Sequence, residues 1–339
     1  MIRPALLFLL VASTAQANVW DNALSRGRGD ALQDKYDGEM RNGDEHAMLA
    51  NSKGISYREA KTQVAAAITA YRAAAGAKPK EAEPWYRIGA VLHSFYLECE
   101  KLPQLQLLNS VLCNKDVFDR KHAEEAIEAW DQFEARAPLD PRLSVDLGHA
   151  QILFERAILH TKLATKPHLE AAARDYEKIL SRNDGTGDTP EQVLGNLAET
   201  YMMLDRLDDS IETYREACRS AADTSTWYGY AVALDRDDHP QQALEVIRSQ
   251  GPDQRELFRN SIAKGTTFYV PEGEKFYYFA LSDEAFGFDD LAADNWRQYI
   301  ASGAHPEFQP RAKAHIDALQ RHGKKHKLPI EPPWQEIFH

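Results

Sequence analysis

The cysteines are the residues of this sequence whose spacing invites a chemical interpretation first. Cys99 and Cys113 lie fourteen positions apart in "LECEKLPQLQLLNSVLCNK", and Cys218 follows in "SIETYREACRS". The first two lack the CxxC spacing of a thioredoxin-type redox pair, and no further ligands stand nearby to complete a zinc site. A disulfide and a pair of buried, unpaired thiols both remain open for them, whereas Cys218 is expected in a helix core.

The N-terminus indicates the compartment in which these thiols lie. "MIRPALLFLLVASTAQANVW" carries one cation, a short apolar run and Ala15-Gln16-Ala17. This pattern predicts a signal peptide over residues 1–17, cleaved after Ala17, and a periplasmic or secreted protein. The run is far shorter than the roughly 20 residues of a membrane span, and no later segment comes close. In an oxidising compartment Cys99 and Cys113 are the candidate disulfide, which would stabilise the fold by about 3 kcal/mol.

Other chemistry finds no support in the sequence. HExxH, GxSxG, GxGxxG and the Walker loop are absent, so no enzyme and no cofactor are predicted. The 12 histidines are dispersed without metal-ligand spacing, and "DKYDGEMRNGDE" lacks the alternating oxygen ligands of a calcium loop around Gly38. No metal is predicted. A net charge of −12 without a basic stripe argues against a nucleic-acid partner.

Helical periodicity runs through most of the chain. Apolar residues recur at i, i+3, i+4 and i+7, while strand-like alternation is hard to find. Residues 18–55 are rich in Gly, Asp and Asn with weak periodicity, so they are predicted to be flexible or loosely docked. The sequence therefore predicts an all-α protein in which the regular helices begin near residue 56.

From Tyr57 onward the sequence repeats itself. The repeated units are "AITAYRAAAGAKPKEAEPWYRIGAVL", "AIEAWDQFEARAPLDPRLSVDLGHAQIL", "AARDYEKIL", "VLGNLAETYMMLDRLDDSIETYREACRSA", "WYGYAVALDRDDHPQQALEVI" and "FYYFALSDEAFGFDDLAADNWRQYI". This pattern resembles the tetratricopeptide repeat (TPR), which places Trp, Leu-Gly and an aromatic residue on one helix and Ala, an aromatic residue and Pro on the next. The resemblance implies a right-handed α-solenoid of about six antiparallel helix pairs, in which small residues such as Gly89, Ala198 and Ala280 face aromatic side chains.

The spacing departs from the regular repeat at three places. Trp85 and Ala126 lie 41 positions apart instead of 16, so an insertion is predicted over residues 97–121. A second stretch with more residues than the regular spacing lies between Ser144 and Ala172. A third such stretch, later in the chain, predicts a linker. The predicted organisation is repeats over residues 56–250, a linker over 251–273, a helix pair with a following helix over 274–322, and a tail over 323–339.

The resemblance also implies which residues line the concave groove of the array. Carried over position by position, they are Tyr86, His93, Arg142, His149, Glu199, Met202, Met203, Tyr228, Asp235, Arg236, Glu274, Tyr277 and Glu284. Tyrosine recurs among them, and such amphipathic aromatic residues are enriched at interfaces. The same tyrosines are equally suited to packing on neighbouring helices. The Lys and Asn set that clamps a C-terminal carboxylate in some TPR proteins is absent.

The function expected from these features is that of a non-enzymatic scaffold. Its groove would bind a partner protein or peptide, in an assembly of the cell envelope. The alternative is a small-molecule or glycan binding protein that uses the same groove or the insertion at residues 97–115. The sequence leaves the partner's identity and the oligomeric state open.

Overall fold

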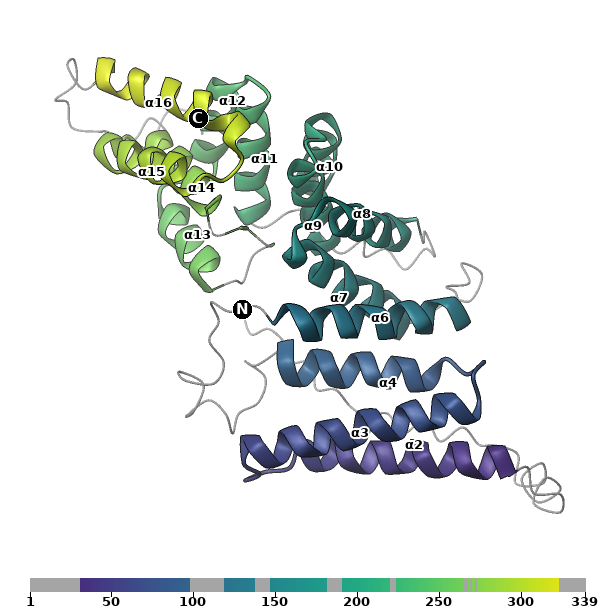
Figure 1. Cartoon of the computed structure of the whole chain (residues 1–339). Helices are drawn as coiled ribbons and strands as arrows, with labels where there is room; N and C mark the ends of the chain where they lie inside the picture. The colour runs from purple at the N-terminus through teal and green to yellow at the C-terminus, as the bar shows by residue number, and fades with distance from the viewer. Residues whose placement is uncertain are drawn as a thin grey trace, which may run out of the picture. The chain divides into compact units, whose positions relative to one another are not determined.

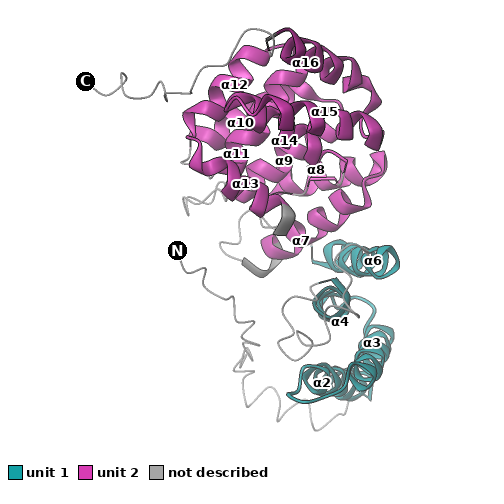
Figure 2. Cartoon of the chain, turned by 90° about the vertical axis from the view of Figure 1, so that its left-hand side faces the viewer, with its two compact units in different colours: residues 1–139 teal, residues 140–339 magenta. Residues whose placement is uncertain are grey.

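The protein is described by a computed structural model over residues 31–97, 119–137, 147–181, 191–219, 224–264, 268, 270–271 and 273–322. Every regular element within these residues is a helix. The chain divides into two compact units, residues 1–139 and residues 140–339 (Figure 2). Each unit is considered by itself. Arg142 and both cysteines of the candidate disulfide, Cys99 and Cys113, lie outside the described residues.

Unit 1 contains two helix pairs. Its elements are α2 (Ala31–Ala50), α3 (Tyr57–Ala77), α4 (Glu83–Leu92), the short π-helix η2 (His93–Leu97) and α6 (Arg120–Arg136). α2 packs along α3, and α4 packs on α6, as the violet, blue and first teal helices of Figure 1 show. The α4–α6 pair is the unit that the sequence predicts between Trp85 and Ala126, with the insertion between its two helices.

Local sequence sets where these helices begin and how closely they pack. α3 starts with a capping box, because the Ser56 hydroxyl accepts from the Glu59 amide and the Glu59 carboxylate accepts from the Ser56 amide. Gly89 on α4 faces the Trp130 ring of α6 so closely that an added Cβ would overlap the indole. The predicted contact between a small and a large residue is therefore present in this pair.

α2 corrects the prediction for residues 18–55. That segment was expected to be flexible or loosely docked, yet residues 31–50 form a helix of 20 residues packed on α3. The cause is tertiary: Gly43 lets the backbone of α2 approach the ring of Tyr71, and the Tyr71 hydroxyl donates to Asp44 over 2.8 Å. Packing on a partner helix thus overrides a composition of low helix propensity.

Unit 2 contains most of the described helices. They are α7 (Leu147–Leu163), α8 (Lys166–Leu180), α9 (Glu191–Met203), α10 (Leu207–Arg219), α11 (Thr224–Arg236), α12 (Pro240–Ser249), α13 (Asp253–Lys264), α14 (Lys275–Ala285), α15 (Asp289–Ser302), the 3-10 turn η4 (Pro306–Phe308) and α16 (Gln309–His322). The pairs α7–α8, α9–α10, α11–α12 and α14–α15 pack most extensively (Figure 1). The predicted fold class, an all-α solenoid of helix pairs, is confirmed.

The predicted linker over residues 251–273 contains a helix, α13. Phe258 of α13 is 2% exposed, and its ring stacks on Tyr228 of α11 with centroids 4.0 Å apart. The helix that follows α13, α14, packs antiparallel to α11. Tyr277 near the start of α14 meets Asp235 near the end of α11, whereas Ser282 meets Tyr228. The insertion of α13 therefore changes how the last helix pair meets the preceding one.

Candidate functional site

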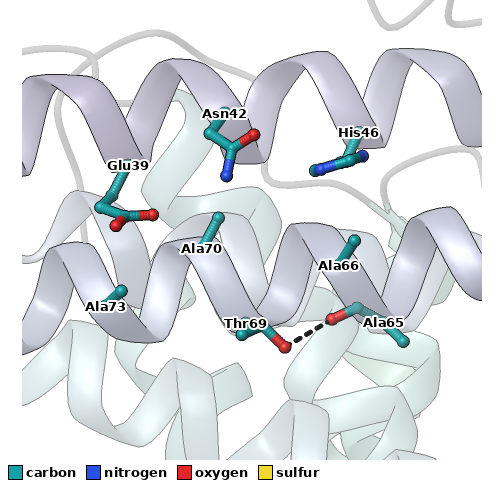
Figure 3. A pocket seen from close by; sticks show the side chains of 8 residues that line it. All are labelled: Glu39, Asn42, His46, Ala65, Ala66, Thr69, Ala70 and Ala73. Carbon is teal, nitrogen blue, oxygen red and sulfur yellow. Dashed lines mark hydrogen bonds between the residues drawn. The ribbon is translucent and has the colours of Figure 1, made fainter.

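A shallow depression lies along the α2–α3 pair of unit 1. Its volume is about 440 Å³, and it is open to solvent. Figure 3 shows Glu39, Asn42 and His46 on α2 pointing towards α3. The α3 side is built from small residues, namely Ala65, Ala66, Thr69, Ala70 and Ala73. One wall can therefore form hydrogen bonds, while the other admits close approach of a second chain.

Periodicity explains why these side chains share one face. Glu39, Asn42 and His46 are spaced i, i+3 and i+7, which places them along one stripe of a helix. His46 is held by Gln63, with Nδ1 2.6 Å from the amide oxygen. On α3, the Thr69 hydroxyl donates back to the Ala65 carbonyl over 2.8 Å (Figure 3). The depression is lined by methyl groups, one carboxylate, one amide and one imidazole.

The sequence-based site prediction missed this surface. The prediction placed α2 in a flexible segment, so its polar stripe had no partner helix. The signal that could have found it is the run of small residues in "VAAAITAYRAAAGA", residues 64–77, together with Gly43. Runs of small residues let two helices approach closely and leave little side-chain volume on the outer surface.

The predicted groove residues of unit 2 are mostly inside the protein. Seven of them are buried: Glu199, Met202, Tyr228, Asp235, Arg236, Glu274 and Tyr277. Glu284 and Met203 are partly exposed. The buried side chains therefore contact other helices of this chain and offer no surface to a partner, which corrects their expected exposure in an open groove. The physical reason is that α13, α14 and α16 supply partners for them.

Glu199 of α9 forms the first buried cluster. Its carboxylate accepts from the hydroxyl groups of Tyr214, over 2.9 Å, and Tyr278, over 2.6 Å. Burial raises the pKa of Glu199 to about 7, against the opposing effect of the Tyr278 hydrogen bond. The cluster ties α9 and α10 to α14.

The second cluster surrounds His315 of α16. Its Nε2 lies 3.0 Å from Oδ1 of Asp235, and its Nδ1 lies 2.8 Å from Oε2 of Glu284. The imidazole also stacks on Trp296, with ring centroids 4.6 Å apart. Burial lowers the pKa of His315, but its bonds to the two carboxylates outweigh burial and raise the pKa to about 9. His315 is therefore a cation held between two acids.

The third cluster is the ion pair between Arg236 of α11 and Glu274 at the start of α14. Their side chains are 1% and 2% exposed. The guanidinium lies 4.8 Å from the centroid of the Tyr277 ring and 4.5 Å from that of Phe308. A buried pair of this kind fixes which helix faces which, because either charge alone in this position is costly.

The sequence did not single out Asp283, the acceptor of a fourth cluster. This fully buried carboxylate of α14 pairs with Arg255 and Arg259 of α13, and Asn295 of α15 donates to it over 2.7 Å. The arginines stand in the predicted linker, so no repeat position pointed to them. In all four clusters the titratable groups bond to one another, which is the arrangement of structural ion pairs.

The remaining predicted groove residues lie in unit 1 and at the start of α7. Tyr86 of α4 is partly exposed and packs on Phe133, with ring centroids 5.9 Å apart. His93 is 9% exposed, and its ring lies 5.5 Å from that of Trp130. His149 belongs to α7, but its side chain lies outside the described residues.

Cys218 of α10 is a free, partly exposed thiol, and burial raises its pKa to about 12. This pKa makes it a poor nucleophile near neutral pH, because the thiolate is the reactive form. Within the described ranges, no three His, Cys, Asp or Glu side chains gather as a metal site would require. None of the helices in those ranges has the length and hydropathy of a membrane span.

Some solved structures are similar to this chain. No family model and no curated protein matches it. One similar structure is "Crystal structure of MamA protein", with a TM-score of 0.42 and 14% identity, covering 70% of this chain and 100% of that one. Another is "YrrB: a TPR protein with an unusual peptide-binding site", with a TM-score of 0.36 and 15% identity, covering 76% of this chain and 100% of that one.

Proposed function

We propose that this protein is a non-enzymatic TPR-like scaffold and that it binds a partner protein or peptide on the α2–α3 surface. The observation that carries this proposal is the depression with an alanine floor and a hydrogen-bonding wall. It is shallow and open, so it suits a helix or an extended segment better than an enclosed small molecule, which a deep pocket would bury.

One further feature supports a non-enzymatic role. In unit 2 the closely spaced titratable groups are buried and bonded to one another, which favours a structural role over catalysis.

The proposal includes a place in the cell. The signal-like N-terminus supports export, so the scaffold is assigned to the periplasm or the cell exterior, in an assembly of the envelope. Fractionation of cells that express the full chain with a C-terminal tag tests this part. Recovery of a cytoplasmic protein that retains residues 1–17 would overturn it.

Site-directed photo-crosslinking in the producing cell tests the partner surface. A photo-reactive amino acid replaces Thr69 on the floor of the depression, or Lys61, which is exposed on α3 and does not line it. We expect a discrete adduct from position 69 and none from position 61. Ala66→Trp, which fills the floor, should reduce the adduct at least tenfold, while Lys61→Trp should leave it unchanged. Identical adducts from both positions would contradict the proposal.

A further inference from the structure

α16 is attached to unit 2 with little apolar contact. Among the described side chains of this helix, only Ala312, His315 and Leu319 are buried, and Ile316 is partly buried. Of these, Leu319 alone is a large, fully apolar buried side chain. By contrast, α14 buries two tyrosines, a leucine and two alanines. Hydrophobic burial therefore explains a smaller part of the attachment of α16 than of α14.

Ion pairs and charged hydrogen bonds account for much of the remaining attachment of α16. Arg311 and His315 are four residues apart and lie on one face of α16. His315 sits between Asp235 and Glu284, and Arg311 pairs with Asp238 and approaches Asp235 to 3.4 Å. We call these three carboxylates, Asp235, Asp238 and Glu284, the acidic seat.

The fit between α16 and this seat is incomplete. Nη2 of Arg311 is buried without a hydrogen-bond partner among the described residues, and its Nε reaches only Asp235, at an ion-pair distance of 3.4 Å. Beneath Phe308, just before α16, Nε of Arg236 and Oε1 of Glu274 are also buried and unpaired. As whole residues, Arg236 and Glu274 are 6% and 2% exposed. Unmet donors and acceptors of this kind weaken an interface, because each has lost its bonds to water.

From these observations we infer that α16 can be displaced from the acidic seat and that the seat is a binding site. The occupant that replaces it is an amphipathic helix of a partner protein with arginine and histidine four residues apart, followed by an apolar residue one turn later. α16 itself shows that a helix of this chemistry fits, and a chain of net charge −12 attracts a basic segment. This inference goes beyond the proposed function, since it concerns unit 2 alone and does not depend on the α2–α3 surface.

The test uses the full chain cut between α15 and α16. A protease recognition sequence is inserted after Gly303, an exposed residue with a φ of 73° in the turn that ends α15. After cleavage, α16 is held only by its contacts. The probe is a labelled synthetic peptide of residues 304–322, followed by fluorescence anisotropy.

We expect saturable binding of the peptide to the cut chain and at least tenfold weaker binding to the uncut chain, in which the tethered α16 competes. A peptide with Arg311→Ala and His315→Ala should bind at least tenfold more weakly. A peptide with Lys313→Ala, an exposed position, is the matched control and should bind like the original. Raising the salt to 0.5 M should weaken binding of the original peptide, because salt screens the pair between Arg311 and Asp238, whose carboxylate is 90% exposed.

A second variant covers the case in which the insertion prevents folding. In the uncut chain with Arg311→Ala and His315→Ala, the chain's own α16 is held less tightly at the acidic seat. This variant should therefore bind the unmodified peptide more tightly than the unmodified uncut chain does.

Absence of peptide binding to both the cut chain and this variant would overturn the inference. So would a loss of far-UV circular dichroism larger than the helical signal of α16 itself when the fragment leaves. Dimers of the uncut chain formed by exchange of α16 would assign the seat to a second copy and overturn the choice of a partner protein. The adduct expected at Thr69 tests the other surface and can succeed or fail independently.

Discussion

The polar residues of the two units are used in opposite ways. In unit 1, Glu39, Asn42 and His46 line an open depression beside alanines. In unit 2, Glu199 and Asp235 are 2% and 0% exposed and accept hydrogen bonds from neighbouring helices. Both units are built from helix pairs, so the repeat pattern alone does not decide whether a polar side chain meets solvent. What decides it is the number of further helices that pack over that face.

The largest expected loss of stability comes from removing a buried ion pair in unit 2. Arg236→Met leaves the carboxylate of Glu274 buried without its ionic partner. Removing one member of a buried ion pair costs about 3–5 kcal/mol, so the free energy of unfolding should fall by that amount. Urea unfolding followed by far-UV circular dichroism measures it.

The matched control is Arg206→Met, because Arg206 pairs with Asp209 at the surface, where the two side chains are 45% and 51% exposed. Exposed pairs of this kind contribute less than about 1 kcal/mol. Equal losses in the two variants would show that burial of the Arg236–Glu274 pair does not set its strength.

The interior of unit 2 also shows where sequence-based prediction stops. The repeat register identified α9, α11 and α14 as helices, since aromatic and small residues recur there with helical spacing. It could not show that Tyr228 is buried, because its stacking partner Phe258 lies on α13, in the predicted linker. Among the described side chains of α13, Phe258 is the one in the buried core, which is too little for a periodic apolar signal.

For unit 1 the limit was different. The sequence predicted the packing of Gly89 against an aromatic residue, because a glycine in a helix opposite a tryptophan fits the repeat. It did not predict α2, whose glycine, aspartate and asparagine residues have low helix propensity. Contacts with α3 stabilise α2, and contacts between distant residues cannot be read from local composition. The depression was missed for the same reason.

The next effect concerns the pH dependence of unit 2. The pKa of His315 is raised to about 9, above its ordinary value of 6.5. The folded state therefore holds the proton more tightly, and this stabilisation is complete below pH 6.5 and is lost as the pH rises through 9. The shift corresponds to about 3 kcal/mol at most. His315→Gln should lose this pH-dependent part of the free energy of unfolding between pH 7.5 and 9.5.

Urea unfolding at both pH values measures this difference. The control is His239→Gln, because His239 is 48% exposed on the short turn before α12. Its pH profile should match that of the unmodified chain. A His315→Gln profile as steep as that of the unmodified chain would show that another group titrates in this range.

A smaller effect sharpens the description of unit 1. Gly43→Ala would place a methyl group inside the Tyr71 ring, so α2 must move away from α3. Overpacking of this kind costs about 1–3 kcal/mol. Gly38→Ala on the same helix meets nothing within 4 Å and should instead stabilise by about 0.5–1 kcal/mol. Urea unfolding of both variants should therefore give changes of opposite sign.

Because Gly43 sets the distance between α2 and α3, Gly43→Ala should also alter the depression and reduce the photo-adduct at Thr69. Gly38→Ala should leave that adduct unchanged. Equal effects of the two substitutions would mean that α2 is not held against α3 by this contact.

The smallest expected effect lies at the start of α3. Ser56→Ala removes the hydroxyl that accepts from the Glu59 amide over 3.3 Å. Loss of such a cap costs about 1 kcal/mol. Thr62→Ala, further along the same helix and exposed, should change stability by about 0.5 kcal/mol or less, because alanine is the better helix former.

Hydrogen exchange separates the local from the global consequence of Ser56→Ala. The amides of the first turn of α3 should exchange faster, while those near Thr69, more than three turns away, keep their protection. The photo-adduct at Thr69 should also persist, because the floor of the depression is fixed by packing on α2 at Gly43 rather than by the helix end. Loss of protection along the whole of α3 would instead show that the α2–α3 pair unfolds as one unit once its cap is removed.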